Sequence, residues 1–284
     1  VEGNNMKSLM IQGTASGVGK TTLVAALCRI FSDKGYTVAP FKSQNMSNFG
    51  YATPDFEISR AQVIQAIGAR CKIESDLNPI MLKPLGNYYS SVYLNGKRYK
   101  KMHAKDYYSN FVNTKGIKAA TDSLFRLQNN NDLVILEGAG SPAEINLQKY
   151  DIANMKIAQK ANASVLLVAD IDKGGSFASL VGTMALIEKK YQKLIKGFVL
   201  NKFRGDIDVL KPGFRKIKQL TKIPVLGTIP MLKMNLPEED SLNVKAKEIA
   251  WTKNNISKID KELDKLAKVV KNNLDLKKIE MLIK

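Results

Sequence analysis

Residues 13–22, with the sequence GTASGVGKTT, combine the residue types that bind nucleotide phosphates. Glycines let the backbone approach an anion closely, and the N–H groups at the start of a helix attract negative charge. We expect Lys20 to reach the terminal phosphates and the hydroxyl of Thr21 to hold Mg²⁺. Five residues separate Gly13 from Gly19, one more than in the common phosphate-binding loop. The predicted nucleotide-binding residues of this loop are Gly13, Thr14, Gly17, Val18, Gly19, Lys20, Thr21 and Thr22.

Three carboxylates are candidates for further metal ligands. Glu137 ends the apolar run LVILE, and a carboxylate at the end of a strand can hold Mg²⁺ directly or through water. Asp55 and Glu57, in the stretch TPDFEISRAQ, are two further candidates, of which we favour Glu57. A solvated loop carboxylate is the alternative interpretation of both. The sequence thus predicts Thr21, Glu137 and Glu57 as the metal ligands.

Polar and apolar residues after three other expected strands suit the remaining parts of a nucleotide site. Lys42, in APFKSQNM, can neutralise charge shared between a γ-phosphate and an incoming carboxylate, although a surface lysine is the alternative. Asn201 and Lys202, in VLNKFRGD, are placed to contact an adenine edge. Ile229 and Pro230, in GTIPML, can form an apolar wall for the base.

The elements that must position these residues alternate along the chain. Short apolar runs predict strands, and helical patterns lie between them. Such alternation indicates a mostly parallel sheet with helices on both faces, in which ligands bind beyond the carboxyl ends of the strands. We predict strands at 7–12, 37–41, 132–137, 164–169, 196–200 and 224–229, and helices near 20–34, 58–71, 104–128, 151–161, 175–190 and 208–220.

Two segments depart from this alternation. Residues 72–103 predict an extended excursion with a short strand or hairpin. In the tail, ISKIDKELDKLAKVV spaces its apolar residues by three and four, which predicts an amphipathic helix with a Lys-rich opposite face. Its apolar face either packs on the body or binds a partner. We therefore divide the chain into residues 1–242 and a helical tail, 243–284. The apolar face comprises Ile256, Ile259, Leu263, Leu266 and Val270.

Composition narrows the classes of function. The 284 residues carry a net charge of +18, but no recognisable nucleic-acid-binding motif accompanies it, so we expect no nucleic acid. A basic proteome or an anionic small substrate would explain the charge equally well. Cys28 and Cys71 do not form a disulfide framework, and His103, the single histidine, belongs to no catalytic arrangement. No apolar run is long enough to span a membrane. A cytoplasmic protein without membrane contact is expected.

The long spacing of the phosphate loop resembles that of dethiobiotin synthetase and its relatives. In the related cell-division and partition ATPases a second lysine precedes the loop lysine by five positions, where this chain has Ala15. The stretches QGTASGVGKTTLVAALCRIF, EISRAQVIQA, LEGAGSPAEINLQKYDIANM and VADIDKGGSFASLVGT resemble, in this order, the synthetase domain of cobyric acid synthases. VAPFKSQNMSN, NPIMLKP, GFVLNKFRGD and PVLGTIP fit the same family. The resemblance covers roughly residues 7–242.

This resemblance implies an ATP- and Mg²⁺-dependent amidoligase of cobalamin biosynthesis. The implied substrate is adenosylcobyrinic acid a,c-diamide, a corrinoid whose peripheral carboxylates become amides through acyl phosphates and ammonia. Lys20, Lys42 and Asp151 are the implied catalytic residues, and Asp170 is placed near the substrate with lower priority.

Full-length members of this family also carry a glutaminase domain. KELDKLAKVVKNNLDLKKIEML resembles the tail that closes those enzymes, so we hypothesise a chain without that domain, supplied with ammonia from solution or from a separate glutaminase. Two alternatives remain: another carboxylate-activating synthetase of the dethiobiotin type, and a nucleotide-dependent switch. The oligomeric state stays open, and a homo-oligomer is compatible with the sequence.

Overall fold

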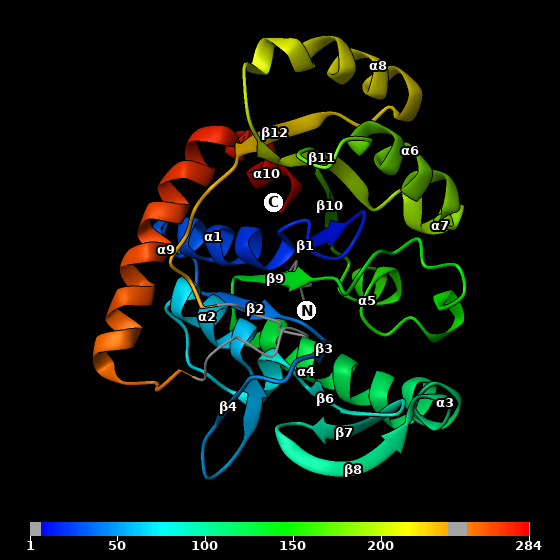
Figure 1. The fold of residues 1–284 in the computed structure, drawn as a ribbon, viewed down its shortest axis with the longest axis vertical. Helices are drawn as coiled ribbons and strands as arrows, with labels where there is room; N and C mark the ends of the chain where they lie inside the picture. The colour runs from blue at the N-terminus through cyan, green and yellow to red at the C-terminus, as the bar shows by residue number, and fades with distance from the viewer. Residues whose placement is uncertain (1–6, 238–248, 284) are drawn as a thin grey trace, which may run out of the picture.

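A six-stranded parallel sheet forms the centre of the protein (Figure 1). The computed structural model describes residues 7–237 and 249–283. The strand order is β12-β11-β10-β1-β9-β2, so β1, which leads into the phosphate loop, is central. The predicted fold class is confirmed. The strands are β1 (Lys7–Gly13), β2 (Val38–Phe41), β9 (Leu133–Glu137), β10 (Ser164–Asp170), β11 (Ile195–Phe203) and β12 (Val225–Pro230).

Helices cover both faces of this sheet because its strands are apolar on both sides. One face packs against α1 (Lys20–Asp33), α9 (Lys253–Asn273) and α10 (Leu276–Leu282). The other packs against α4 (Ile117–Asn130), α5 (Met155–Lys160), α6 (Ser176–Leu186) and α8 (Lys211–Thr221), with the short α7 (Lys189–Gln192) after α6. Helix α2 (Arg60–Ala69) contributes to both cores.

A second, four-stranded sheet occupies the region predicted to be an extended excursion. It is ordered β3-β6-β7-β8, from β3 (Gln44–Met46), β6 (Ile80–Gly86), β7 (Tyr89–Leu94) and β8 (Lys97–His103). A separate antiparallel pair, β4 (Gly50–Ala52) and β5 (Glu57–Ser59), precedes α2. The excursion is therefore more ordered than the sequence suggested, and it draws in β3 from outside the predicted range.

Three predicted helices begin later than expected. The single helix predicted over residues 104–128 is wrong at its start, where the short α3 (Ala104–Asp106) and a π-helical segment (Tyr107–Gly116) precede α4. The helix predicted from residue 151 begins at Met155, because the carboxylate of Asp151 holds the preceding residues in a turn by accepting from the N–H of Asn154, and it also accepts from the N–H of Lys156 in the first turn of the helix. The helix predicted near 208–220 opens with a 3₁₀ turn (Ile207–Leu210) before α8.

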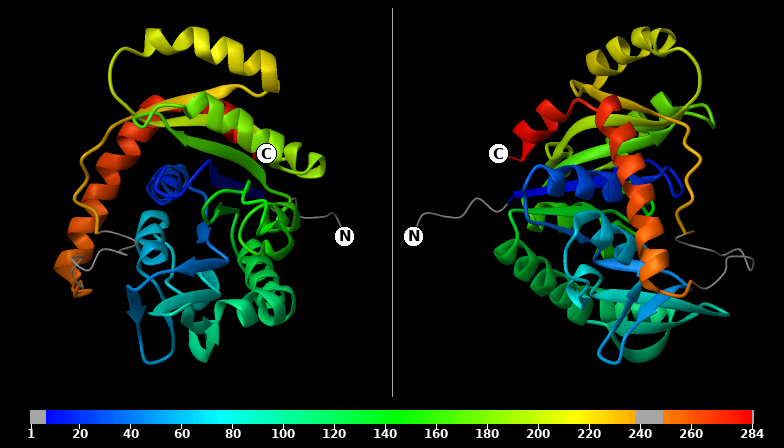
Figure 2. Two further views of the ribbon diagram at one scale, coloured as in Figure 1. Left: turned by 45° about the vertical axis from the view of Figure 1, so that its right-hand side comes forward. Right: turned by 90° about the vertical axis from the view of Figure 1, so that its left-hand side faces the viewer.

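Helix α9 runs along one side of the molecule, across α1 and α2 (Figures 1 and 2). Its apolar residues Ile259, Leu263, Leu266 and Val270 are buried, so the tail packs on the body. After α9, Leu274 pairs in antiparallel fashion with Gly227 of β12. The predicted division at residues 242 and 243 lies outside the described residues and stays a prediction. Among the described residues, no helix combines the length and the apolar character that crossing a bilayer requires.

Candidate nucleotide-binding site

The loop between β1 and α1 has the backbone that a phosphate-binding loop needs. Gly19 adopts a φ of 92°, in the left-handed region that favours glycine. A Cβ at Gly19 would lie 2.2 Å from Nδ2 of Asn201, and one at Gly13 would lie 2.9 Å from Nζ of Lys20. The loop is anchored to the sheet because the N–H of Thr14 donates to the carbonyl of Val168 over 2.9 Å. Glycine is therefore required both for backbone shape and for space.

Lys20 lies over this loop at the first residue of α1. Its Nζ donates to the carbonyl oxygens of Ala15, at 3.0 Å, and Gly140, at 2.8 Å. The side chain thus bridges the loop and the segment that follows β9, and it is buried. An ammonium held in this position faces the hollow where the loop would cradle phosphates.

Glu137 is the centre of a buried polar cluster. Its Oε1 accepts from the hydroxyl of Thr21 at 2.8 Å and from Nζ of Lys42 at 2.7 Å. Its Oε2 accepts from the side-chain amide of Gln65 at 2.5 Å. The carboxylate is only 1% exposed, so its charge is balanced by Lys42 rather than by water. Three of the predicted site residues therefore meet in one cluster.

The oxygen atoms of this cluster are suitable ligands for Mg²⁺. The hydroxyl of Thr21 and the carboxylate of Glu137 are hard oxygen ligands, which Mg²⁺ prefers, and they lie within hydrogen-bonding distance of each other. Within the part of the chain that the structure describes, no group of three or more His, Cys, Asp or Glu side chains could hold a metal. Such a site fits an ion that takes only one or two protein ligands and completes its shell with water and phosphate.

A second network supports the loop from β10 and β11. Nζ of Lys202 donates to the carbonyl of Gly17 at 2.7 Å and to Oδ2 of Asp170 at 2.8 Å. Nδ2 of Asn201 donates to the carbonyl of Val18 at 2.8 Å. Burial alone would raise the pKa of Asp170, but the hydrogen bond and charge of Lys202 outweigh it and hold that pKa below its usual value. Asn201 and Lys202 thus fix the loop, and their predicted contact with the base stays a prediction.

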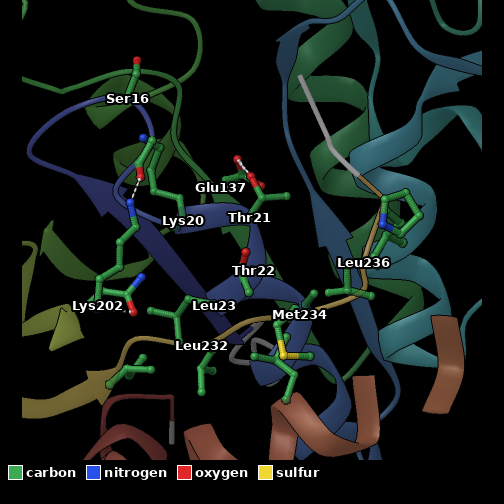
Figure 3. A pocket seen from close by; sticks show the side chains of 18 of the residues that line it. Ser16, Lys20, Thr21, Thr22, Leu23, Glu137, Lys202, Leu232, Met234 and Leu236 are labelled. Carbon is green, nitrogen blue, oxygen red and sulfur yellow. Dashed lines mark hydrogen bonds between the residues drawn. The ribbon is translucent and has the colours of Figure 1, made fainter. Parts of the chain in front are cut away.

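These residues open into a cavity of about 780 Å³ (Figure 3). Its polar part contains the phosphate loop and Glu137, and its apolar part lies between α1, residues 231–237 and α9. The polar lining includes Ser16, Gly17, Gly19, Lys20, Thr21, Thr22, Lys42, Glu137, Asn201 and Lys202. The apolar lining includes Leu23, Ala25, Ile64, Ile229, Pro230, Met231, Leu232, Met234, Leu236, Leu266 and Val270.

Five predicted site residues do not line this cavity: Gly13, Thr14 and Val18 of the loop, and Glu57 and Asp151 outside it. Glu57 forms an ion pair with Lys83 of β6, and its role as a metal ligand stays a prediction without support from its position. Asp151 accepts the backbone N–H groups of Ala153, at 3.0 Å, Asn154, at 2.7 Å, and Lys156, at 2.9 Å. Of these three N–H groups only that of Lys156 lies in α5, so Asp151 mainly fixes the turn before this helix. Its predicted catalytic role stays a prediction.

Sequence reasoning missed Gln65 and most of the apolar part of the cavity, of which it had predicted Ile229 and Pro230. Gln65 and Gln62 lie one turn apart on α2, where the amide of Gln62 donates to Oε1 of Gln65. That spacing, in the stretch EISRAQVIQA, was the available signal. Nothing in the sequence of residues 231–237, apart from their apolar character, indicated that they line the cavity.

A family model described as "CobQ/CobB/MinD/ParA nucleotide binding domain" matches residues 9–243. The chain belongs to this family. Within it, the chain is 52% identical over 239 residues to a probable cobyric acid synthase of Thermococcus kodakarensis, covering 83% of this chain and 49% of that protein. It is 50% identical over 242 residues to a cobyric acid synthase of Sorangium cellulosum, covering 84% and 46%.

The chain spans about half the length of the curated relatives it matches. Among solved structures, the signal recognition particle receptor FtsY of Elizabethkingia anophelis with GDP has a TM-score of 0.46 and 17% identity, and the match covers 90% of this chain and 63% of that chain. That likeness is too weak to support an inference. The family membership supports nucleotide binding by residues 9–243, which include the phosphate loop.

Proposed function

We propose that the protein is an ATP-dependent carbon–nitrogen ligase of the cobyric acid synthase type, which amidates peripheral carboxylates of adenosylcobyrinic acid a,c-diamide in cobalamin biosynthesis. The observation that carries this proposal is the meeting of Lys42, Thr21 and Glu137 beside the phosphate loop. Lys42 brings a second ammonium group to the phosphate loop, in addition to that of Lys20. Two positive charges suit a reaction in which a phosphoryl group passes to a carboxylate. The similarity to cobyric acid synthases supplies the substrate class.

In the proposed reaction, an oxygen of the substrate carboxylate attacks the γ-phosphorus of ATP. The bond to ADP breaks, and an acyl phosphate forms. Ammonia then attacks the acyl carbon, phosphate leaves and a proton is lost, which yields the amide. Lys20 and Lys42 neutralise charge on the transferred group and hold the reacting oxygens in line. Thr21 and Glu137 would hold Mg²⁺, which when bound neutralises phosphate charge.

The nitrogen source is a separate part of the proposal. We expect free ammonia, or ammonia from a separate glutaminase chain, to serve this chain. Glutamine is therefore expected not to support turnover by the purified chain alone. A cytoplasmic location and the oligomeric state stay predictions.

The test is turnover of the purified chain with Mg²⁺, ATP, adenosylcobyrinic acid a,c-diamide and an ammonium salt. We expect corrinoid-dependent release of ADP, with amidated corrinoid detected by mass spectrometry, and loss of both with Lys20→Met. ADP release that is indifferent to the corrinoid, or a corrinoid that stays unchanged, would contradict the proposal. Turnover with glutamine in place of ammonium would contradict only the proposed nitrogen source.

The two alternative functions gain no support from the fold. A switch that binds partners through its Lys-rich tail could not use Ile259, Leu263, Leu266 and Val270 of α9 for this, because they are buried. Its Lys-rich face stays the surface to test, and deletion of residues 243–284 should then abolish partner binding. A dethiobiotin-type synthetase would bind a diaminononanoate instead of a corrinoid, and the same assay with that substrate distinguishes the two.

A further inference from the structure

The cavity at the phosphate loop includes residues from beyond the matched family domain. The family match ends at residue 243, whereas α9 begins at Lys253. Leu266 and Val270 of α9 nevertheless line the cavity that contains Lys20 and Thr21. The tail helix therefore shares one hollow with the phosphate loop, and no comparison with known proteins assigns it a part in nucleotide binding.

The apolar part of the cavity is layered. Leu23, in the first turn of α1, is buried beside Leu266 and Val270, which form the floor. Leu232 and Met234, from the segment of residues 231–237, pack against this floor and remain half-exposed. Figure 3 shows Leu23, Leu232, Met234 and Leu236 pointing toward the hollow, with α9 below them. The result is an apolar compartment, open to solvent, that begins one helical turn from the phosphate-binding residues.

Helix α9 is fixed firmly enough to serve as a floor. The guanidinium of Arg29 on α1 is fully buried and forms ion pairs with Asp260 and Asp264 of α9. At the other end of α9, the N–H of Asp275 donates to the carbonyl of Leu226 in β12 at 2.7 Å. The helix is thus tied both to the helix that begins with the phosphate-binding residues and to the edge of the sheet.

Helix α9 also holds the segment above it. The backbone N–H of Asn235 donates to Oε2 of Glu262 at 3.3 Å, so residues 231–237 are connected to α9 from their middle. A planar apolar ring that enters the cavity would lie against Leu232 and Met234, which pack on the core cluster that contains Leu266 and Val270. The bases of nucleotides have this shape and chemistry.

We propose that α9 is part of the nucleotide site: its residues Leu266 and Val270 form the floor of the compartment that takes the base of the bound nucleoside triphosphate. This inference rests on the proposed binding of ATP by the phosphate loop. It adds that the affinity for the base depends on the tail helix, whereas the affinity for the phosphates does not.

The test compares two ligands that share the phosphates and differ in the base. Calorimetry with Mg²⁺-ATP and with Mg²⁺-tripolyphosphate is carried out on the full chain and on three variants. Val270→Phe fills the floor, Leu266→Ala hollows it, and Lys268→Ala alters an exposed residue of the same helix as a matched control. Changes of this size in an apolar pocket shift affinity by about tenfold or more.

We expect Val270→Phe and Leu266→Ala each to lower the affinity for ATP by about tenfold and to leave the affinity for tripolyphosphate unchanged. Lys268→Ala should alter neither affinity. Unchanged ATP affinity in Leu266→Ala, or equal changes for both ligands, would overturn the inference. If Val270→Phe no longer binds tripolyphosphate either, that substitution has damaged the fold, and the inference is then judged from Leu266→Ala alone. If the unaltered chain binds neither ligand, the proposed function itself fails, which is distinguishable because that result needs no variant.

Discussion

Replacement of Arg29 by methionine should destabilise the protein far more than replacement of an exposed arginine would, because Arg29 is fully buried. The Nε of Arg29 donates to the carbonyl of Gly68 at 2.9 Å, and Nη2 donates to the carbonyl of Ile67 at 3.0 Å, both near the end of α2. The same guanidinium pairs with Asp260 and Asp264 of α9. One fully buried side chain therefore connects three helices.

The magnitude follows from what each partner loses. Methionine fills the volume but leaves the carbonyl of Gly68 without this donor, at a cost of about 1–3 kcal/mol. The carbonyl of Ile67 still accepts from the N–H of Arg70. Asp260 and Asp264 are 44% and 55% exposed, so water solvates them, and their mutual repulsion one turn apart adds about 0.5 kcal/mol. We expect a total loss of about 2–4 kcal/mol, at the lower end of the range for a buried ion pair.

The assay is urea denaturation followed by circular dichroism, with Arg70→Met as the matched control. Arg70 and its partner Asp33 are about half exposed, so this control should lose less than about 1 kcal/mol. For Arg29→Met the midpoint should fall by about 1 M urea. Equal losses in the two variants would refute the reasoning, because burial of the guanidinium would then contribute nothing.

Three further predictions concern the site. Gln65→Met, which removes a hydrogen-bond donor from Oε2 of Glu137, should lower turnover by about 10- to 100-fold and raise the Mg²⁺ concentration needed for half-maximal rate, whereas a change of stability alone would leave that concentration fixed. Glu137→Gln should lower turnover more than about 100-fold, and Glu57→Gln should retain activity; the reverse order in a steady-state assay would restore Glu57 as the metal ligand. Asp170→Asn should destabilise the protein at neutral pH, and the difference from the unaltered chain in urea midpoints should shrink as the pH falls through the lowered pKa of Asp170, since the pairing with Lys202 requires the ionised carboxylate. A difference independent of pH would show that this pair contributes no charge-dependent stability.

The phosphate loop and its partners across the sheet could be predicted because they depend on local sequence and on strand ends. Glu137 and Lys42 each follow a short apolar run, and in the sheet Phe41 of β2 pairs with Leu136 of β9. Parallel neighbours bring the residues after them together at the same edge. Once the strands were identified, the meeting of these two side chains needed no further information.

Gln65 could not be predicted because its position depends on how α2 packs. All residues from Arg60 to Ala66 are buried, so the helix lacks an apolar stripe that would indicate which face points toward the site. Glu57 and Asp151 illustrate a different limit. A carboxylate in a loop or at the start of a strand has the same sequence signature whether it binds a metal, pairs with a lysine or fixes a turn, and only its neighbours in space distinguish these roles.

The pairing of Leu274 with Gly227 has a consequence for the behaviour of the protein in solution. β12 is the outermost strand of its sheet, and an uncovered strand edge invites a strand from another molecule. A Cβ at Gly227 would lie 2.2 Å from the carbonyl oxygen of Asn273, so the absence of a side chain allows the chain to close over that edge. Molecules shortened before this point would present open backbone donors and acceptors to one another, and we expect them to aggregate during purification.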